Sequence, residues 1–336
     1  MIDECELSSK NSLETTKTGS SLAGSFYKFP VLISLSGPLG AGKTVFVKGL
    51  GSGLGLKSPS VVTSPTFALE QRYENKLLHI DFYRLKKNQT AEILHQSEDF
   101  PGIRIVEWAD RAGGDIDEDI RINIEEMPDD NERRKILISF LDMKLPTQKE
   151  IAGWRKEVLL PEHIVRHNDM VAEVCERLIP YLNKNGMVIR KQATIAAART
   201  HDLLRFIDFK SSRNNWDDFT GKQRVLWKKL KDRFTGSHES AAADFVSEKG
   251  YPEIGKIIMT HRGYSDESEK IPKTNEQILL SYSDKRVLED KIVTLEERFA
   301  YFSRHYAGGK ETPFAQNWYK DMRAAEKKLF PEKVPF

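Results

Sequence analysis

The stretch GPLGAGKT, from Gly37 to Thr44, decides the fold of the first half of this chain. It matches the phosphate-binding pattern G-x-x-x-x-G-K-[ST] at every fixed position. Glycines let backbone N–H groups turn toward phosphate oxygens, and the helix that follows adds its positive N-terminal end. Lys43 is placed to reach the β- and γ-phosphates, and the Thr44 hydroxyl can bind Mg²⁺. VLISLSG before the loop and KTVFVKGL after it supply the strand and the helix, which a chance glycine-rich turn would not need.

Composition sets the broad class. The 336 residues are 39% hydrophobic and 30% charged, which is typical of a soluble globular chain with room for two domains. Its 52 basic residues nearly balance its 50 acidic ones, so we expect no surface for non-specific nucleic-acid binding and no DNA partner. Cys5 and Cys175 are too few and too far apart for a disulfide framework. Without a long apolar run or a signal peptide, the sequence predicts a cytoplasmic protein with no membrane partner.

The residue pattern changes near Lys144. Runs before it have strand length and β-branched or aromatic content: VLISLSG (31–37), PTFALEQRY (65–73), KLLHIDFYR (76–84), GIRIVEW (102–108), DIRINIEE (119–126) and KILISFL (135–141). Segments after it carry apolar residues at helical spacing, among them KQATIAAARTHDLLRFI (191–207), LSYSDKRVLEDKIVTLEERFAYFSRHY (280–306) and a last amphipathic tail from Thr312. We predict an α/β mixed sheet of the P-loop NTPase type over residues 1–145 and an all-α helical bundle with a C-terminal covering helix over 146–336.

Nucleotide hydrolysis also requires a carboxylate that supports Mg²⁺ and a group that orients water. Asp81, at the end of LLHIDF, is the stronger candidate for the metal side, because the carboxyl end of a strand faces the phosphate crevice. Glu107, at the end of IRIVEW, is the other candidate. From spacing alone, a surface ion pair explains either residue nearly as well.

Four ordered motifs closely resemble the bacterial TsaE (YjeE) family over about residues 10–142. They are GPLGAGKT, VTSPTF (62–67), HIDFYRL (79–85) and VEWADR (106–111). That family is a P-loop ATPase serving the complex that makes threonylcarbamoyladenosine in tRNA. The resemblance implies ATP and Mg²⁺ as cofactors, subunits of the tRNA-modification transferase complex as partners, and tRNA as an indirect one.

The same resemblance implies site residues. Cofactor contacts would come from Gly37, Gly40, Ala41, Gly42, Lys43, Thr44, Val45, Thr66 and Trp108. Thr44 and Asp81 would lie near Mg²⁺, and Asp81 and Glu107 would be catalytic. The loop of residues 64–67 would act as a switch. Two positions depart from the family pattern: Pro38 replaces an acidic residue, and Ala109–Asp110 replaces Pro-Glu.

Histidines gather in the helical half. Six of the eight in the chain follow Lys144: His163, His167, His201, His238, His261 and His305. A single helical histidine is more often packed or solvated than a ligand. Here carboxylates accompany them, in the pair His201–Asp202 and in the segments SHESAA and SYSDKRV. Imidazoles with carboxylates suit divalent transition metals, and two such ions would polarise a phosphate and generate hydroxide near neutral pH.

The pattern H…HD…H…H…D resembles the HD superfamily of metal-dependent phosphohydrolases over about residues 160–310. It maps to His167, His201, Asp202, His238, His261 and Asp284. The resemblance implies an HD-type helical bundle with a metal pair, Fe or Mn, with Ni, Co or Zn as alternatives. Asp202 would bridge, with His167, His201 and Asp284 on one ion and His238 and His261 on the other.

Arg205 stands where the commoner HDIGK form of that superfamily has lysine, so we expect it to contact a substrate phosphate and to take part in catalysis. His163 and His305 do not fit the pattern. Trp216 and Trp227 lie between Asp202 and His238, and core packing suits them better than stacking on a base.

The leading interpretation is a bifunctional enzyme. One domain would hydrolyse ATP in support of tRNA modification, and the other would hydrolyse a phosphoester or phosphoanhydride, in a nucleotide substrate. The alternative is a nucleotide-dependent switch that loads a partner protein and carries a non-catalytic helical scaffold. A nucleotide kinase ranks last, because no arginine-bearing lid insertion is visible in the first half.

Overall fold

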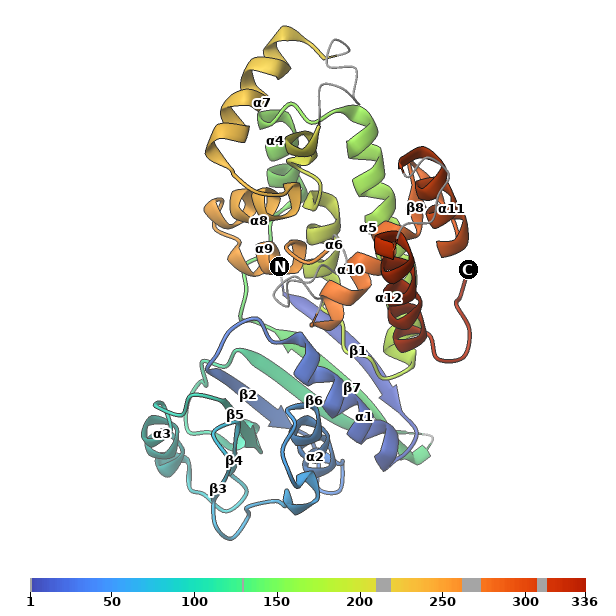
Figure 1. The fold of residues 1–336 in the computed structure, drawn as a ribbon. Coiled ribbons are helices and arrows are strands. Elements are labelled where there is room, and N and C mark those ends of the chain that lie inside the picture. The colour runs from blue at the N-terminus through green and yellow to red at the C-terminus, as the bar shows by residue number, and fades with distance from the viewer. Residues whose placement is uncertain (1, 129, 210–218, 262–272, 307–312) are drawn as a thin grey trace. The chain divides into compact units, whose positions relative to one another are not determined.

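The computed structural model describes residues 2–128, 130–209, 219–261, 273–306 and 313–336 (Figure 1). The chain divides into two compact units. Unit 1 contains Met1–Met143 with Pro180–Arg190, and unit 2 contains Lys144–Ile179 with Lys191–Phe336. Figure 1 shows a twisted sheet with helices in the first unit and a helical bundle in the second.

Unit 1 is built on a seven-stranded mixed sheet in the order β1-β7-β6-β2-β5-β4-β3. Its strands are β1 (Asp3–Ser9), β2 (Val31–Ser36), β3 (Glu70–Tyr73), β4 (Leu77–Asp81), β5 (Ile103–Glu107), β6 (Ile120–Met127) and β7 (Asp130–Phe140). β2 runs parallel to β5 and β6, and β4 runs parallel to β5. The strands β1, β3 and β7 pair antiparallel with their neighbours. The carboxyl ends of β2, β4 and β5 therefore meet at one edge of the sheet.

Hydrophobic cores cover both faces of this sheet. The helices of unit 1 are α1 (Ser12–Leu22), α2 (Lys43–Gly53) and α3 (Lys87–Gln96). One core joins Leu77 to side chains of α1 and α2, and the other joins Leu78 to side chains of α3. Successive residues of β4 point to opposite faces, so its run of apolar side chains is buried on both sides.

Glycines bring α1 and α2 into close contact. A Cβ on Gly19 would lie 2.2 Å from the carbonyl oxygen of Phe46, and one on Gly49 would lie 2.1 Å from that of Thr16. Neither distance is compatible with a side chain unless the backbones move apart. This contact holds the helix that begins at Lys43 against the sheet, and with it the phosphate-binding loop.

Unit 1 also has features that were not predicted, among them the helix α3. β1 and α1 lie in a polar N-terminal stretch, where β1 buries only alternate residues and two of the four, Asp3 and Ser9, are polar. The expected strand over residues 65–73 begins only at Glu70, because Leu69 has φ 67° and its N–H donates to the carbonyl oxygen of Pro65. Residues 65–69 are therefore a turn.

The segment Pro180–Arg190 packs with unit 1, although a division at residue 145 assigns it to the helical half. Arg190 is fully buried and forms an ion pair with Asp142. Its Nε donates to the carbonyl oxygen of Ser25 at 2.9 Å, and the N–H of Val188 donates to Ser21 Oγ at 2.9 Å. A buried guanidinium requires such partners, so these contacts fix the segment on unit 1.

The described part of unit 2 is helical apart from one short hairpin. Its elements are α4 (Gln148–Glu157), α5 (Glu162–Lys184), α6 (Lys191–Thr200), α7 (Gly221–Arg233), α8 (His238–Glu248), α9 (Pro252–Ile258), α10 (Asn275–Lys285), β8 (Val287–Leu288), β9 (Lys291–Ile292), α11 (Leu295–Tyr306) and α12 (Pro313–Leu329). The helical character and the last helix agree with the sequence pattern. No described helix is long and apolar enough to cross a membrane.

Two helical segments were predicted too long. The segment 280–306 is interrupted by the hairpin β8–β9, where the buried Arg286 donates from Nε to the carbonyl oxygen of Val293. The segment 191–207 leaves the helix after Thr200, and His201 Nδ1 donates to the carbonyl oxygen of Ala198 at 2.7 Å. A side chain that binds a terminal carbonyl ends a helix without leaving that group unsatisfied.

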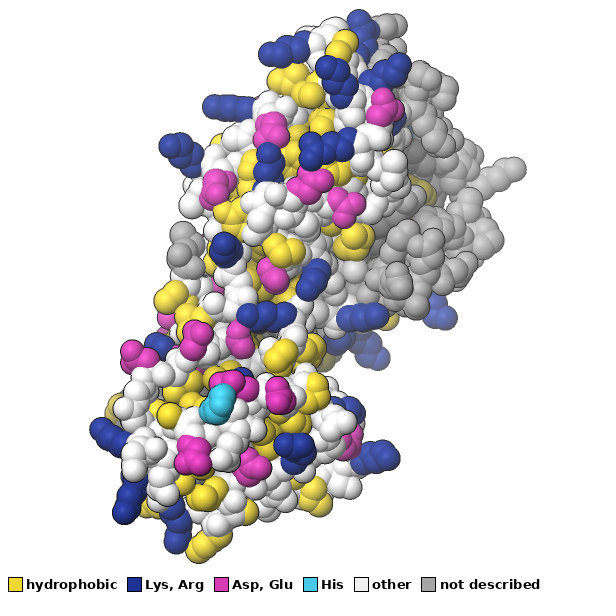
Figure 2. Space-filling view, turned by 90° about the vertical axis from the view of Figure 1, so that its left-hand side faces the viewer, with side chains coloured by type: hydrophobic (Ala, Val, Ile, Leu, Met, Phe, Trp, Pro, Cys, Tyr) yellow, Lys and Arg dark blue, Asp and Glu magenta, His cyan; other side chains and the backbone are white. Residues whose placement is uncertain are grey.

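Lys and Arg side chains are interspersed with Asp and Glu on the face drawn in Figure 2. This mixture agrees with the near balance of 52 basic and 50 acidic residues.

The glycine contact between α1 and α2 can be tested by adding a single methyl group. Gly49→Ala should destabilise the protein by about 1–3 kcal/mol, because the new Cβ meets the backbone of Thr16. The matched control is Gly153→Ala in α4, where a Cβ meets nothing within 4 Å and should stabilise by about 0.4–1 kcal/mol. Urea denaturation followed by circular dichroism measures both, and equal effects would contradict the packing argument.

Candidate nucleotide site and candidate metal centre

The phosphate-binding loop lies at the carboxyl edge of the parallel strands, between β2 and α2. Gly37, Gly40 and Gly42 have φ angles of 144°, 84° and 97°, a region that residues with a Cβ rarely adopt. A Cβ on Gly37 would also lie 2.2 Å from the carbonyl oxygen of Ile124. The glycines of the motif are therefore required by the backbone, and Ala41, which is buried, completes the loop.

Lys43, the first residue of α2, is buried and folds back over the loop. Its Nζ donates to the carbonyl oxygens of Gly37 and Pro38 at 2.8 and 2.9 Å. It also lies 3.6 Å from the centre of the Trp108 ring. Burial lowers the pKa of Lys43, and the charge of Glu107 opposes that shift. Lys43 and Trp108 are far apart in sequence but meet at the carboxyl edge of the parallel strands. Thr44 and Val45 follow Lys43 in the first turn of α2.

Glu107 is the carboxylate that contacts the P-loop hydroxyl. Thr44 Oγ1 donates to Glu107 Oε1 at 2.9 Å, and the same oxygen lies 2.9 Å from His79 Nε2. His79 is fully buried, and among the described residues its Nδ1 has no hydrogen-bond partner. The neutral tautomer protonated on Nε2 satisfies this geometry without burying a charge. A hydroxyl that donates to Glu107 keeps its lone pairs for Mg²⁺.

Asp81 lies beside Glu107 in the register of β4 and β5 but has a different role in this structure. Its Oδ2 accepts hydrogen bonds from Ser64 Oγ at 2.6 Å and from Thr66 Oγ1 at 2.7 Å. The N–H of Tyr83 donates to Oδ1 at 2.7 Å. Asp81 therefore attaches the predicted switch loop to the end of β4, and Thr44 contacts Glu107 rather than Asp81.

The six predicted metal ligands come together in unit 2. His167 lies within α5 and Asp284 in α10, whereas the others lie at helix ends: His201 and Asp202 after α6, His238 at the start of α8 and His261 after α9. Among the described residues, three groups have all their ligand atoms within 4.8 Å of one another: His167–His201–Asp284, His201–Asp202–His261 and His238–Glu239–His261. The groups share members, so together they form one continuous cluster.

Short distances connect the cluster. His167 Nε2 lies 3.0 Å from Asp284 Oδ1, and His238 Nε2 lies 3.1 Å from Asp202 Oδ1. The same oxygen of Asp202 is 3.6 Å from His261 Nε2. Asp202 is therefore the carboxylate nearest to both sides of the cluster.

Each imidazole is anchored through Nδ1 and turns Nε2 toward the centre. The Nδ1 partners are the carbonyl oxygens of Glu289, Ala198 and Ile258 for His167, His201 and His261, and the carboxylate of Asp208 for His238. Within the described part of the chain, the buried Nε2 atoms of His201 and His261 have no hydrogen-bond partner. Such an atom costs about 1–3 kcal/mol unless something binds it. Anchored imidazoles beside carboxylates fit a divalent transition metal.

Both predicted carboxylate ligands are held in the ionised form. Burial alone would raise the pKa of Asp202, but the charges of His201 and Arg205 hold that pKa well below its usual range. For Asp284, burial is again opposed, here first by Lys285, and the pKa lies well below its usual range. An ionised carboxylate is the form that binds a cation.

Arg205 lies beside the cluster and is its most accessible charged group. Its side chain is 42% exposed, whereas that of Asp202 is 11% exposed. Its Nε lies 3.9 Å from Asp202 Oδ2, and its NH1 lies 3.6 Å from Asp208 Oδ2. The same NH1 lies 2.8 Å from His238 Nδ1 and 2.9 Å from His238 Nε2. The guanidinium can therefore meet an anion from solvent while it stays beside the candidate ligands.

Known proteins resemble the part of the chain that contains the candidate nucleotide site. A family model described as "Threonylcarbamoyl adenosine biosynthesis protein TsaE" matches residues 9–136. A protein of Aquifex aeolicus (strain VF5), named tRNA threonylcarbamoyladenosine biosynthesis protein TsaE, is 44% identical over 110 residues, which are 32% of this chain and 75% of that protein. The chain belongs to the TsaE family.

Other TsaE proteins match in the same way. That of Treponema pallidum (strain Nichols) is 32% identical over 37% of this chain and 93% of its own length. That of Bacillus subtilis (strain 168) is 37% identical over 29% of this chain and 61% of its own length. The crystal structure of Bacillus subtilus YdiB, at 27% identity and a TM-score of 0.33, covers 42% of this chain and 88% of that one. The residues that match the TsaE family model lie within unit 1.

The structure adds residues that sequence reasoning missed. In the TsaE-family unit, His79 contacts Glu107, and Arg134 donates from Nε to the carbonyl oxygen of Ala41 at 2.9 Å. His79 could have been found, because it lies two residues before Asp81 on the same face of a buried strand. In unit 2, Glu239 and Lys285 join the cluster as neighbours of predicted ligands.

The remaining candidates lie elsewhere. His163 and His305 are exposed and outside the cluster. Trp227 is fully buried, stacks on Phe206 at 4.7 Å and donates from Nε1 to the carbonyl oxygen of Val158. It is thus a packing residue, whereas Trp216 lies outside the described residues.

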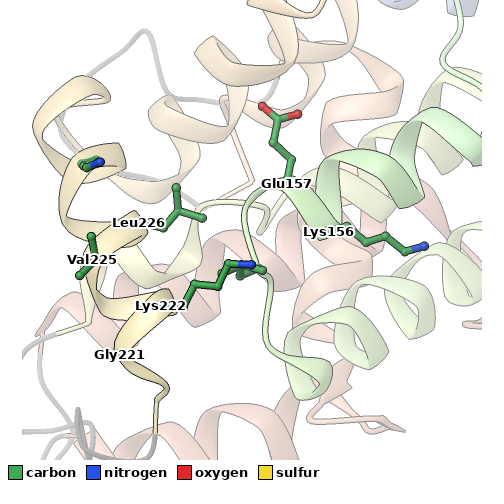
Figure 3. A pocket seen from close by; sticks show the side chains of 8 residues that line it. Lys156, Glu157, Gly221, Lys222, Val225 and Leu226 are labelled. Carbon is green, nitrogen blue, oxygen red and sulfur yellow. The ribbon is translucent and has the colours of Figure 1, made fainter.

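A separate pocket of about 510 Å³ opens in unit 2 between the end of α4 and the start of α7 (Figure 3). It is lined by Lys156, Glu157, Leu159, Gly221, Lys222, Val225, Leu226 and Lys229. Glu157 pairs with Lys249 at 2.7 Å. None of the predicted site residues lines this pocket, so it is distinct from the metal cluster.

Metal binding to the cluster predicts a shift in thermal stability. A ligand at 100 times its Kd stabilises the native state by about 2.7 kcal/mol, which raises the Tm of a unit of this size by about 5–10 °C. Mn²⁺ should produce this shift in the wild type and not in His201→Ala combined with Asp202→Ala. Differential scanning calorimetry measures it, with His163→Ala combined with His305→Ala as the control. An equal shift in the cluster variant would exclude the cluster as the metal site.

Proposed function

We propose that the TsaE-family unit, residues 1–145, binds and hydrolyses ATP with Mg²⁺ in support of tRNA threonylcarbamoyladenosine modification. Family membership supports the pathway, because the relatives are named for that biosynthesis. The contact between Thr44 and Glu107 at the end of a glycine-rich phosphate loop supports the ATP and Mg²⁺ site. Subunits of the transferase complex are the proposed partners, with tRNA involved indirectly.

Different residues of this site would bind the phosphates and the Mg²⁺ ion. Backbone N–H groups of the loop from Gly37 to Gly42, with Lys43, would bind the phosphates, and Thr44 would hold Mg²⁺. Glu107 accepts the Thr44 hydrogen bond and is itself oriented by His79. When bound, Mg²⁺ neutralises charge on the phosphates and positions them for attack.

Exchange of Glu107 for an amide tests this assignment. Glu107→Gln should lower the rate of Mg²⁺-dependent phosphate release from ATP by about 10²-fold or more, because a charged oxygen beside the metal is lost. Lys43→Ala should weaken nucleotide binding, measured with a fluorescent ATP analogue. Glu70→Gln, on an exposed position of β3, is the control. Wild-type turnover in Glu107→Gln would remove Glu107 from the mechanism.

We propose in addition that the helical unit, residues 146–336, is an HD-type metal-dependent phosphohydrolase. The observation that supports this is the convergence of six predicted ligands from separate helices, with buried and unsatisfied ring nitrogens at the centre. Scattered histidines on a scaffold would have no reason to share one buried cluster. The proposed substrate is a phosphoester or phosphoanhydride in a nucleotide.

Two ions, Fe or Mn, with Ni, Co or Zn as alternatives, would be held by these side chains. His167, His201 and Asp284 would hold one, His238 and His261 the other, and Asp202 would bridge them. When bound, such a pair supplies Lewis acidity and lowers the pKa of water. Arg205, which is accessible beside the cluster, would bind the substrate phosphate and stabilise its charge.

Separate variants should divide the two activities. His201→Ala combined with Asp202→Ala should abolish Mn²⁺- or Fe²⁺-dependent release of phosphate or nucleoside monophosphate from a nucleotide panel, and leave ATP binding intact. Lys43→Ala should do the reverse, because its site is in the other unit. His163→Ala combined with His305→Ala is the control. Metal-dependent activity that survives in the cluster variant, or a protein that binds only trace metal, would reject the phosphohydrolase.

A further inference from the structure

Glu239 is a third buried carboxylate in the metal cluster. It is the second residue of α8, follows His238 directly, and is 2% exposed. Its Oε1 lies 3.3 Å from His238 Nε2. With His238 and His261 it forms a group whose ligand atoms all lie within 4.8 Å of one another. Glu239 thus has the position of a ligand on the side of the cluster opposite His167.

The charges of the cluster are divided unevenly between its two sides. Asp284 contacts the ammonium group of Lys285, which is also buried and donates to the carbonyl oxygen of His261 at 3.3 Å. On the other side, Asp202 is shared with His238 and His261 at 3.1 and 3.6 Å. The carboxylate of Asp208 contacts His238 from its Nδ1 side. Among the described residues, only the shared Asp202 would therefore face the Nε2 atoms of His238 and His261 if Glu239 were absent. A buried carboxylate among imidazoles is itself stabilised by a cation in their midst.

We propose that Glu239 is a ligand of the second metal ion, the one that His238 and His261 would hold. This inference rests on the proposed metal pair. Each ion then has two imidazoles and two carboxylates, with Asp202 common to both. The ligands of the first ion would be His167, His201, Asp284 and Asp202. Those of the second ion would be His238, His261, Glu239 and Asp202. Ligand sets of imidazoles and carboxylates without sulfur suit Mn²⁺ and Fe²⁺ better than metals that prefer thiolate ligands.

The competing explanation is that Glu239 only stabilises the start of a helix, where acidic side chains interact favourably with the dipole. The chain offers a matched control for this effect. Glu276 is the second residue of α10, is fully buried, and belongs to none of the three ligand groups among the described residues. Glu239→Gln and Glu276→Gln remove the same charge from the same helix position, and only one of them is at the cluster.

The experiment measures metal binding by the full chain, independently of activity. Metal-free protein is titrated with Mn²⁺, and bound ions per chain are counted by elemental analysis while calorimetry gives the Kd values. Wild type and Glu276→Gln should bind two ions. Glu239→Gln should bind the second ion at least about tenfold more weakly. His167→Ala should lose the first ion, and the double variant His167→Ala with Glu239→Gln should bind the remaining ion at least about tenfold more weakly than His167→Ala does.

The outcomes separate the inference from the function on which it rests. If Glu239→Gln binds both ions with wild-type Kd values, or the double variant still binds the ion that His167→Ala retains with unchanged Kd, the inference is wrong while the metal pair stands. A wild type that binds no Mn²⁺ overturns both. Should Glu239→Gln fail to fold, Glu239→Asp keeps the charge and shortens its reach, and undiminished affinity for the second ion in that variant also overturns the inference.

Discussion

Buried polar side chains must find partners, and this constraint explains the arrangement of both sites. In the nucleotide site the protein supplies the partners itself. The carboxylate of Glu107 forms hydrogen bonds with the Thr44 hydroxyl and the His79 ring, and that of Asp81 accepts hydrogen bonds from the hydroxyls of Ser64 and Thr66. In the metal centre the described part of the chain leaves ring nitrogens of His201 and His261 unsatisfied. In the first site the carboxylates are therefore satisfied by neighbouring side chains, whereas the second keeps buried ring nitrogens that have no hydrogen-bond partner among the described residues.

Both sites lie where regular elements end. The phosphate loop follows β2, and the carboxylates of Asp81 and Glu107 end β4 and β5. In unit 2, four of the six predicted ligands occupy helix termini or the residues just beyond them. At such positions a side chain can leave the direction that a helix or strand imposes, while the element behind it keeps the site rigid. The close contact of α1 with α2 at Gly19 and Gly49 is the part of this rigidity that positions Lys43.

Much of this arrangement could be predicted from the sequence. The strand–loop–helix context of GPLGAGKT predicted the loop, the parallel strands beside it and the place of Lys43. The grouping of His167, His201, Asp202, His238, His261 and Asp284 was implied by the resemblance to the HD superfamily, and the structure brings these side chains together. β1 and α1 were missed because their buried residues include Asp3, Ser9, Thr15 and Thr18, so the apolar pattern there is weak. The hairpin β8–β9 was missed because helical spacing continues through it.

The sequence by itself determined which side chains are candidates for binding phosphate, which are candidates for binding metal, and that the two groups fall in separate halves of the chain. Only the tertiary structure decided the partners. It assigned Thr44 to Glu107 rather than to Asp81, attached the loop of Ser64 and Thr66 to Asp81, and brought Glu239 to His261. The physical reason is that these contacts depend on strand register and on where each helix ends, and residue spacing along one chain does not specify either.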